Sequence, residues 1–113
     1  IISIDKLIER LLSYAAAEDQ GHLRFMIASA LQGVIHQELL PATNGAKRVA
    51  CEILIAIDAV KNILRNRDSF LLRNVIHTGS RYGMVTMRQS IESLLAEGAI
   101  TEEVAQGVLV NYL

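Results

Sequence analysis

The sequence is poor in aromatic residues, proline and cysteine, and each shortage limits what the chain is. Aromatic residues make up 4% of its 113 residues, tryptophan is missing, and proline and cysteine occur once each. A single cysteine, Cys51, excludes an internal disulfide and agrees with a reducing cytoplasmic setting. Few aromatic side chains are available to stack on nucleic-acid bases, so the core has to be built from aliphatic residues.

Charge of one sign and long apolar runs are also lacking. The 11 basic and 12 acidic residues give a formal net charge of -1, so we expect no nucleic-acid partner and no attraction to anionic lipid. No apolar run approaches the roughly 20 residues of a membrane span, and no signal segment opens the sequence. The chain starts with Ile1 and enters an amphipathic pattern almost at once, so we expect a fragment or a chain whose earlier part is missing.

What the sequence does have is helical periodicity that is interrupted once. Hydrophobic residues make up 51% of the chain, which is enough for a modest core. Apolar residues recur with helical spacing over residues 4–12 and again over residues 23–34. The only proline then precedes an Asn44-Gly45 turn signal, with β-rich apolar runs on both sides. We predict a hairpin here, with strands near residues 34–40 and 48–57.

Helical spacing returns after this hairpin. Asp58, Ser69 and Thr101 stand where N-caps are expected, because their side chains accept hydrogen bonds from the free N–H groups of a first turn. Gly79 and Gly98 stand where helices are expected to end. The predicted fold class is mostly α with one β-hairpin. Two strands cannot stand alone as a sheet core, so we expect the hairpin to pack on helices or to join a larger sheet. The helices are predicted over residues 59–66, 69–79, 84–97 and 101–109.

Residues that carry chemistry are scarce. No GxxxxGK[ST] sequence is present, so nothing here cradles a triphosphate, and the loop at 79–83 is interpreted as the end of a helix. His22, His36 and His77 lack the spacing and the cysteine partners of a zinc site. Cys51 lies in an apolar run, where a thiol is usually an inert small hydrophobe. We therefore predict no catalytic, cofactor-binding or metal-binding residue in this chain.

Four basic residues lie close together in the sequence: Lys61, Arg65, Arg67 and Arg73. Lys61 and Arg65 share one face of a helix at positions i and i+4. The simplest interpretation is a solvated helix face. The functional interpretation is a contact surface for an acidic partner or a neighbouring subunit, and a nucleic-acid contact ranks third.

Several short motifs occur in an order that resembles one protein family. Residues 32–41 (QGVIHQELLP) are similar to its x-G-V-I-x-Q-x-L-L-P strand, and residues 48–54 (RVACEIL) to its R-V-A-x-E-I-L partner strand. Residues 59–66 (AVKNILRN) resemble its A-I-R-N-L-I-R-E element, and residues 76–87 its I-Q-T-G and G-M-x-T-M motifs. Residues 94–103 are similar to its closing helical hairpin. The family is that of the type IV pilus retraction, or twitching-motility, motor ATPases, which are PilT-like members of the type II/IV secretion ATPase superfamily.

The resemblance implies a place and a task for the chain. It implies the C-terminal helical part of a RecA-like α/β motor ATPase. Residues 1–57 would form the C-terminal edge of the RecA-like core, and residues 58–113 the C-terminal helical domain. The chain would transmit ATP-driven motion in a hexamer that powers pilus retraction, without ATPase activity of its own. ATP and Mg²⁺ would belong to the full-length parent.

The resemblance also implies partners, a location and site residues. The partners would be neighbouring subunits of a homo-hexamer and inner-membrane pilus platform proteins, with no nucleic acid and no direct membrane insertion. The location would be cytoplasmic, peripheral at the inner-membrane base of the pilus. A retraction element, or partner contact, would consist of Ala59, Val60, Lys61, Asn62, Ile63, Leu64, Arg65 and Asn66. A family motif loop would consist of His77, Thr78, Gly79, Gly83 and Met84.

The chain departs from the family pattern at several positions. Lys61 replaces an arginine, Asn66 a glutamate and His77 a glutamine, and residues 70–72 replace a more polar stretch. Lysine loses the bidentate pairing that arginine offers to a carboxylate. Two alternatives therefore stay open: the equivalent part of a pilus-assembly or type II secretion ATPase, and a stand-alone helical adaptor or regulatory interaction domain. A small DNA-binding domain is disfavoured by the net charge.

Overall fold

The structure is a computed structural model that describes residues 3–66 and 68–112. The predicted class, mostly α with one β-hairpin, is confirmed. No helix in these parts of the chain is long and apolar enough to cross a bilayer. Arg67, one of the four clustered basic residues, lies outside the described residues. The helices and strands are α1 (Ile4–Leu12), α2 (Gln20–Ala30), β1 (Gly33–Pro41), β2 (Lys47–Ile55), α3 (Asp58–Arg65), α4 (Leu72–Thr78), α5 (Met87–Ala96) and α6 (Glu102–Leu109). The short 3-10 turns are η1 (Ala17–Asp19), η2 (Ser69–Leu71), η3 (Ser80–Tyr82) and η4 (Val110–Tyr112).

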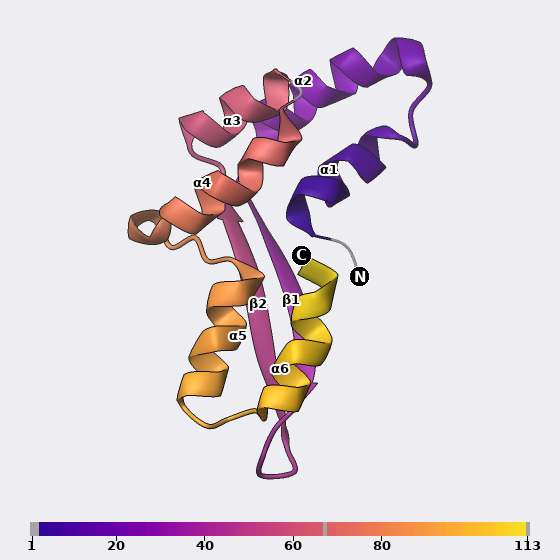
Figure 1. Ribbon diagram of the computed structural model, residues 1–113. Helices are drawn as coiled ribbons and strands as arrows, with labels where there is room; N and C mark the ends of the chain where they lie inside the picture. The colour runs from indigo at the N-terminus through magenta and orange to yellow at the C-terminus, as the bar shows by residue number, and fades with distance from the viewer. Residues whose placement is uncertain (1–2, 67, 113) are drawn as a thin grey trace.

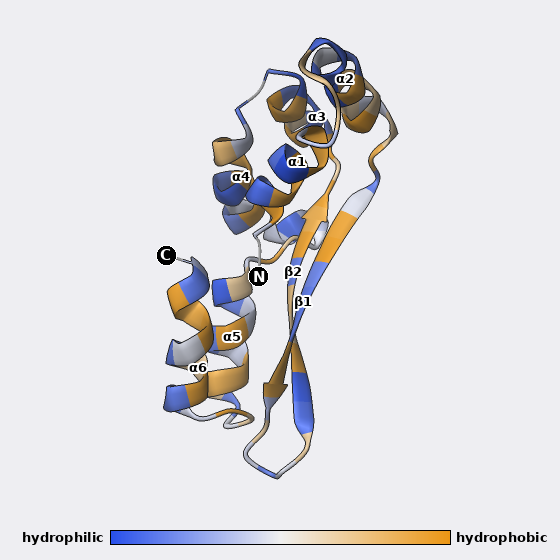
Figure 2. Cartoon of the chain, turned by 90° about the vertical axis from the view of Figure 1, so that its right-hand side faces the viewer, coloured by the Kyte–Doolittle hydropathy of each residue, from blue (hydrophilic) through white to orange (hydrophobic). Residues whose placement is uncertain are grey.

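The hairpin forms the long spine of the molecule. The chain measures 50 × 30 × 21 Å along its principal axes. Helices α1 to α4 gather at one end of the hairpin, and α5 and α6 lie side by side along the other end (Figure 1). In the side view, α4, α5 and α6 all lie on the same side of the two strands (Figure 2). The prediction that the hairpin packs on helices is therefore confirmed.

The two strands pair in one antiparallel register. Gly33 lies opposite Ile55 at one end, and Pro41 lies opposite Lys47 at the other. Gly45 has a φ of 84°, a left-handed conformation that glycine adopts without steric strain. The predicted Asn-Gly turn is therefore the turn that closes the hairpin.

The prediction that the second strand reaches residue 57 is wrong. Strand β2 ends at Ile55. Ile57 is already the N-cap of α3, and its carbonyl oxygen accepts a hydrogen bond from the backbone N–H of Lys61 at 3.1 Å. Beyond the hairpin itself, Val85 pairs with Ile53 through two backbone hydrogen bonds of 2.9 and 3.3 Å. This bridge attaches the segment before α5 to the free edge of β2.

The predicted division of the chain into residues 1–57 and 58–113 stays a prediction.

The buried side chains of the described residues form two clusters, one under each group of helices. The first cluster contains Ile4, Ile8, Leu12, Ala28, Leu54, Val60, Leu64, Leu72, Ile76 and Met84. The second contains Leu40, Ala50, Met87, Ile91, Leu94, Ile100, Ala105, Leu109 and Tyr112.

The two faces of the hairpin differ in burial because side chains alternate along a strand. Leu40 and Ala50 point into the second cluster and are buried. Ile35, Leu39 and Val49 lie on the other face and are exposed. That the hairpin joins a larger sheet stays a prediction.

Two residues that were predicted to cap helices, Asp58 and Ser69, do not do so. Asp58 is the first residue of α3 rather than its cap, and the N-cap is Ile57, whose apolar side chain cannot accept a hydrogen bond. Ser69 opens η2, and its hydroxyl donates to the carboxylate of Glu9 instead of capping the next helix. Thr101 is confirmed as a cap, since its hydroxyl oxygen accepts a hydrogen bond from the N–H of Val104 at 3.2 Å.

The predicted limits of two helices also need correction. Helix α2 ends at Ala30, and the chain is extended from Leu31 onward, so Val34 belongs to β1. Helix α5 begins at Met87, because the Val85 bridge holds the preceding residues extended.

Gly98 ends α5 as predicted. Its φ of 76° is left-handed. The N–H of Gly98 donates to the carbonyl of Leu95 at 3.1 Å, and the N–H of Ala99 donates to that of Leu94 at 3.0 Å. These two bonds are those of a Schellman motif, which satisfies the last carbonyl groups of a helix.

Two glycine-to-alanine changes are expected to act with opposite signs. Gly98→Ala places a Cβ in a left-handed conformation and should lower the free energy of unfolding by about 1–2 kcal/mol. Gly107 lies inside α6, and a Cβ built there has space, because among the described residues no atom beyond the adjacent backbone of its own helix lies within 4 Å. Gly107→Ala should therefore raise the free energy of unfolding by about 0.5–1 kcal/mol. Urea unfolding monitored by circular dichroism measures both, and effects of the same sign would contradict the structure.

Candidate functional site

Helix α3 carries most of the predicted retraction element and has two distinct faces. Val60 and Leu64 are fully buried in the first cluster, and Ile63 packs against its edge. On the outer side, Asn62 and Arg65 are exposed, and the Arg65 guanidinium donates to the side-chain oxygen of Asn62 at 3.2 Å. The predicted inward residues of α3 are therefore confirmed as core. Of the rest of the element, Ala59 is exposed, Lys61 is half-buried, and Asn66 is the exposed C-cap.

A buried arginine holds the end of α3 in place. Arg24 of α2 has a side chain that is only 10% exposed. Its Nη1 donates to the carbonyl oxygen of Leu64 at 3.2 Å, and its Nη2 donates to both carboxylate oxygens of Glu9 at 3.1 and 3.2 Å. Hydrogen bonds between charged groups are stronger than neutral ones, and a cation is favourable at a helix C-terminus. Arg24 therefore fixes α3 to both α1 and α2.

Sequence reasoning missed Arg24. The pattern assigned Leu23 and Ile27 to the inward face of α2, and these residues do pack against the core. Two other residues of α2 are nevertheless buried more deeply than Leu23 and Ile27. They are Arg24 and, one turn on, Ala28. Helical periodicity alone gives no signal for a buried cation, because its partners are 15 and 40 residues away in the sequence.

The predicted motif loop is a tight return from α4 to the edge of β2. A Cβ built on Gly79 would lie 2.8 Å from the carbonyl oxygen of Val75 and 2.8 Å from Cε of Met84, so only glycine fits without a shift. Gly83 has a φ of 87°, a left-handed backbone conformation that glycine adopts without steric cost. Met84 is buried against the loop.

The other loop residues join α4 to the start of α5. The Thr78 hydroxyl donates to the carbonyl of Asn74 at 3.1 Å, inside α4. His77 is exposed, and its backbone oxygen accepts a hydrogen bond from the side chain of Gln89 at 3.3 Å. Gln89 also completes a capping box with Thr86, the N-cap of α5. The structure therefore brings the loop and α5 together, whereas the element 59–66 lies on a separate helix.

Glu52 is a buried carboxylate between two helix N-termini. It lies on β2 and is 6% exposed. One of its oxygens accepts a hydrogen bond from the N–H of Ile4, the first residue of α1, at 3.2 Å. The other accepts one from the N–H of Met87, the first residue of α5, at 3.3 Å. Because a helix N-terminus has free N–H groups and a partial positive charge, one carboxylate stabilises both helices.

Removal of one Glu52 oxygen is expected to cost stability. In Glu52→Gln, an amide N–H₂ group replaces one acceptor and faces a backbone N–H donor, so the free energy of unfolding should fall by about 1–3 kcal/mol. Urea unfolding measures this change. Glu92→Gln is the control, because Glu92 is exposed and lies 3.9 Å from Arg88, and its loss should change stability by less than about 0.5 kcal/mol. Equal effects of the two variants would show that the buried carboxylate has no special role.

Tyr112 attaches the last turn to β1. Its hydroxyl donates to Oε1 of Glu38 at 2.9 Å and lies 2.7 Å from Nε2 of His36. Burial raises the pKa of Tyr112 well above its usual range, and the hydrogen bond to Glu38 and the charges of Glu38 and Glu52 add to this effect. The phenol is therefore held in its neutral form, as a donor.

The raised pKa predicts how stability depends on pH. In the unfolded chain Tyr112 loses its proton near pH 10, while in the folded chain it keeps the proton, so the free energy of unfolding should fall as the pH rises above about 10. Tyr112→Phe should be less stable by about 1 kcal/mol at pH 7, and this difference should shrink above pH 10. Thermal unfolding of both proteins from pH 7 to 11 measures it. A difference that stays constant over this range would contradict the assignment.

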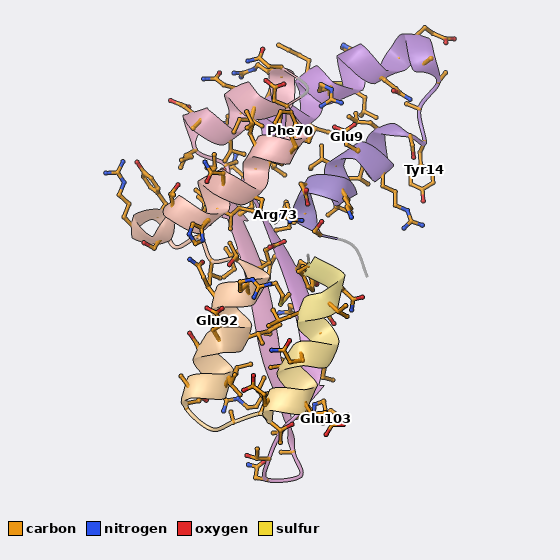
Figure 3. All side chains as sticks on the ribbon, viewed as in Figure 1. Glu9, Tyr14, Phe70, Arg73, Glu92 and Glu103 are labelled. Atoms are coloured by element: carbon orange, nitrogen blue, oxygen red, sulfur yellow. The ribbon has the colours of Figure 1, made fainter. Side chains whose placement is uncertain are left out.

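A cavity of about 380 Å³ lies where α4, the start of α5 and η4 meet. Phe70 and Arg73 lie on the η2–α4 segment next to the junction with α1, as labelled in Figure 3. Phe70 and His77, two positions at which the chain departs from the family pattern, both line the cavity. Its other lining residues are Glu52, Asn74, Thr86, Met87, Arg88 and Tyr112.

Comparison with known proteins shows that the chain is similar, in both sequence and fold, to proteins of pilus retraction. No family model matches the sequence. The chain is 38% identical over 102 residues to the twitching motility protein of Neisseria gonorrhoeae, with 89% of this chain and 27% of that protein covered. It is 33% identical over 104 residues to the type IV pilus retraction ATPase PilT of Pseudomonas aeruginosa, with 92% of this chain and 30% of that protein covered.

A solved structure agrees with these relatives. The crystal structure of the pilus retraction motor PilT with bound ADP superimposes with a TM-score of 0.78 at 31% identity, covering 95% of this chain and 29% of that one. The structure thus has the fold of the C-terminal part of PilT-type ATPases. The chain belongs to the PilT-like family and corresponds to the C-terminal part of these proteins. It spans less than a third of the length of these relatives.

Proposed function

We propose that this chain is the C-terminal part of a hexameric motor ATPase that powers type IV pilus retraction, and that it transmits ATP-driven motion to the pilus machinery. The likeness to proteins named for twitching motility and pilus retraction supports this role. The single structural observation that carries it is the construction of α3. Its inner face is locked into the core while its outer face presents polar and basic side chains.

The residues of this chain do not fit ATP or Mg²⁺. The sequence has no phosphate-binding loop, and the described residues contain no group of three His, Cys, Asp or Glu that could hold a metal ion. We therefore propose that the nucleotide site lies in the part of the motor outside this chain. The role of the chain is mechanical, as in other rigid-body domain movements.

Transmission requires that α3 moves together with its neighbours. Arg24 joins the carbonyl of Leu64, in the last turn of α3, to Glu9 on α1, and Ser69 donates to the same carboxylate. Val60 and Leu64 add the apolar contact. A force applied to the outer face of α3 is therefore passed to α1, α2 and η2 as one rigid group, because close-packed cores transmit displacement.

The outer face of α3 is suited to an acidic surface. Arg65 is exposed and Lys61 half-buried, and they lie one turn apart. We propose that they contact inner-membrane platform proteins or a neighbouring subunit of the ring, at the cytoplasmic base of the pilus. Complementary charge of this kind sets orientation and the rate of encounter more than affinity.

Charge reversal on α3 is expected to separate hydrolysis from retraction. In the motor that carries this sequence, Lys61→Glu with Arg65→Glu should leave ATP turnover within about twofold of the parent, because the changes lie on a surface. The retraction rate of labelled pili should fall at least about tenfold, and the twitching zone should shrink with it. The reason is that like charges at an interface cost several kcal/mol.

The matched control is Arg10→Glu on α1, an exposed arginine outside α3, which should change neither activity. Val60→Ala tests the opposite case, because a buried cavity should lower stability and both activities together. If the α3 double variant lost ATP turnover and retraction in parallel, the retraction proposal for α3 would be wrong.

A pilus-assembly or secretion motor remains the second candidate. The observation that favours it is Lys61, which cannot make the bidentate pairing of the arginine in the family pattern. The same double variant separates the two candidates, because an assembly motor with a damaged α3 would lose surface pili, whereas a retraction motor would retain or accumulate them.

A further inference from the structure

The cavity between α4, the start of α5 and η4 has no part in the proposed retraction mechanism. Its volume of about 380 Å³ lies at the lower end of the ~300–1,000 Å³ typical of ligand pockets. We propose that this cavity is a docking site for an acidic segment of a partner protein that carries one apolar side chain. The proposal rests on the cavity alone and is independent of the role in pilus retraction.

The exposed lining of the cavity is basic. Arg73 comes from α4 and Arg88 from α5, and their side chains are 46% and 48% exposed. Their acidic neighbours, Asp5 and Glu92, lie 3.9 Å away, which is longer than the roughly 2.7–2.9 Å of a full charge-assisted hydrogen bond. Both guanidinium groups therefore retain donors that an incoming carboxylate can use. His77 is exposed beside them.

The one carboxylate in the cavity lining does not cancel this charge fully. Glu52 is buried, and each of its oxygens already accepts a backbone N–H, from Ile4 and from Met87. Its negative charge thus faces the positive ends of two helices. The charged side chains that the described lining exposes to solvent are therefore the two arginines, and their open N–H donors suit the carboxylates of an acidic partner.

The apolar part of the lining is the reason why we expect the bound segment to carry an apolar side chain as well as acidic ones. Phe70 is 71% exposed at the edge of the cavity, and the fully buried Met87 and the nearly buried Tyr112 lie inside it. Isolated exposed apolar residues are ordinary. An exposed phenylalanine beside a hollow with buried apolar walls is suited to cover an inserted side chain, because aromatic and arginine residues dominate binding hot spots.

Peptide binding tests the proposal. The purified protein that carries this sequence is titrated into labelled nonapeptides with one central Phe or Leu flanked by Glu, and binding is followed by fluorescence anisotropy. Saturable binding of the Glu peptides is expected, with none for peptides flanked by Lys and weaker binding when the central residue is Ala. Arg73→Gln and Phe70→Ala should each weaken binding by at least about fivefold.

The matched controls are Arg10→Gln and Phe25→Ala, which remove the same side chains from exposed positions outside the cavity and should leave binding unchanged. Circular dichroism establishes that each variant is folded. The proposal is overturned if no Glu peptide binds saturably, or if the cavity variants and the controls weaken binding equally. It is also overturned if a DNA duplex binds more tightly than every peptide through Arg73 and Phe70.

Discussion

A single buried carboxylate joins the two helical groups of this chain. Two strands are too few to form a sheet core, so the hairpin depends on the helices at its two ends, and these form separate clusters of buried side chains. Glu52 accepts hydrogen bonds from the first N–H of α1 and from the first N–H of α5. The start of each helical group is thereby fixed to one point on β2. The relative position of the two groups depends on this point, on the Val85 bridge beside it, and on the hydrogen bond from the Gln89 side chain to the carbonyl of His77.

The same arrangement connects α3 to the rest of the chain through polar contacts. Arg24 fixes the end of α3 to α1, and Glu52 fixes the start of α1 to β2 and α5. Polar contacts as well as apolar packing therefore link α3, through α1, to β2 and the start of α5. Under the proposed function, this set of contacts is the one that would pass motion from the outer face of α3 to the rest of the motor.

Sequence periodicity and turn chemistry predicted most of the fold. The hairpin, its Asn-Gly turn, the Thr101 cap and the Gly98 stop all depend on neighbouring residues, so local pattern is enough to find them. The inward face of α3 was also predictable, because Val60 and Leu64 follow helical spacing. The failures at Asp58 and Ser69 concern polar side chains whose role depends on what lies near them in space.

The polar residues of the site were not predictable for the same reason. Arg24, Glu52 and Tyr112 each have partners 15 to 76 residues away in the sequence. No local spacing distinguishes them from surface residues. The one available signal was that Glu52 falls between Ala50 and Leu54 on the inward face of β2, where a charged residue needs a buried partner.

The most direct test of the account is retraction by a chimera. The segment of Pseudomonas aeruginosa PilT that aligns with this chain is replaced by this sequence, and the chimera is expressed in cells that lack their own retraction motor. We expect light microscopy of labelled pili to show retraction, and the purified chimera to hydrolyse ATP. A chimera that hydrolyses ATP normally but never retracts a pilus would contradict the claim that this chain transmits retraction.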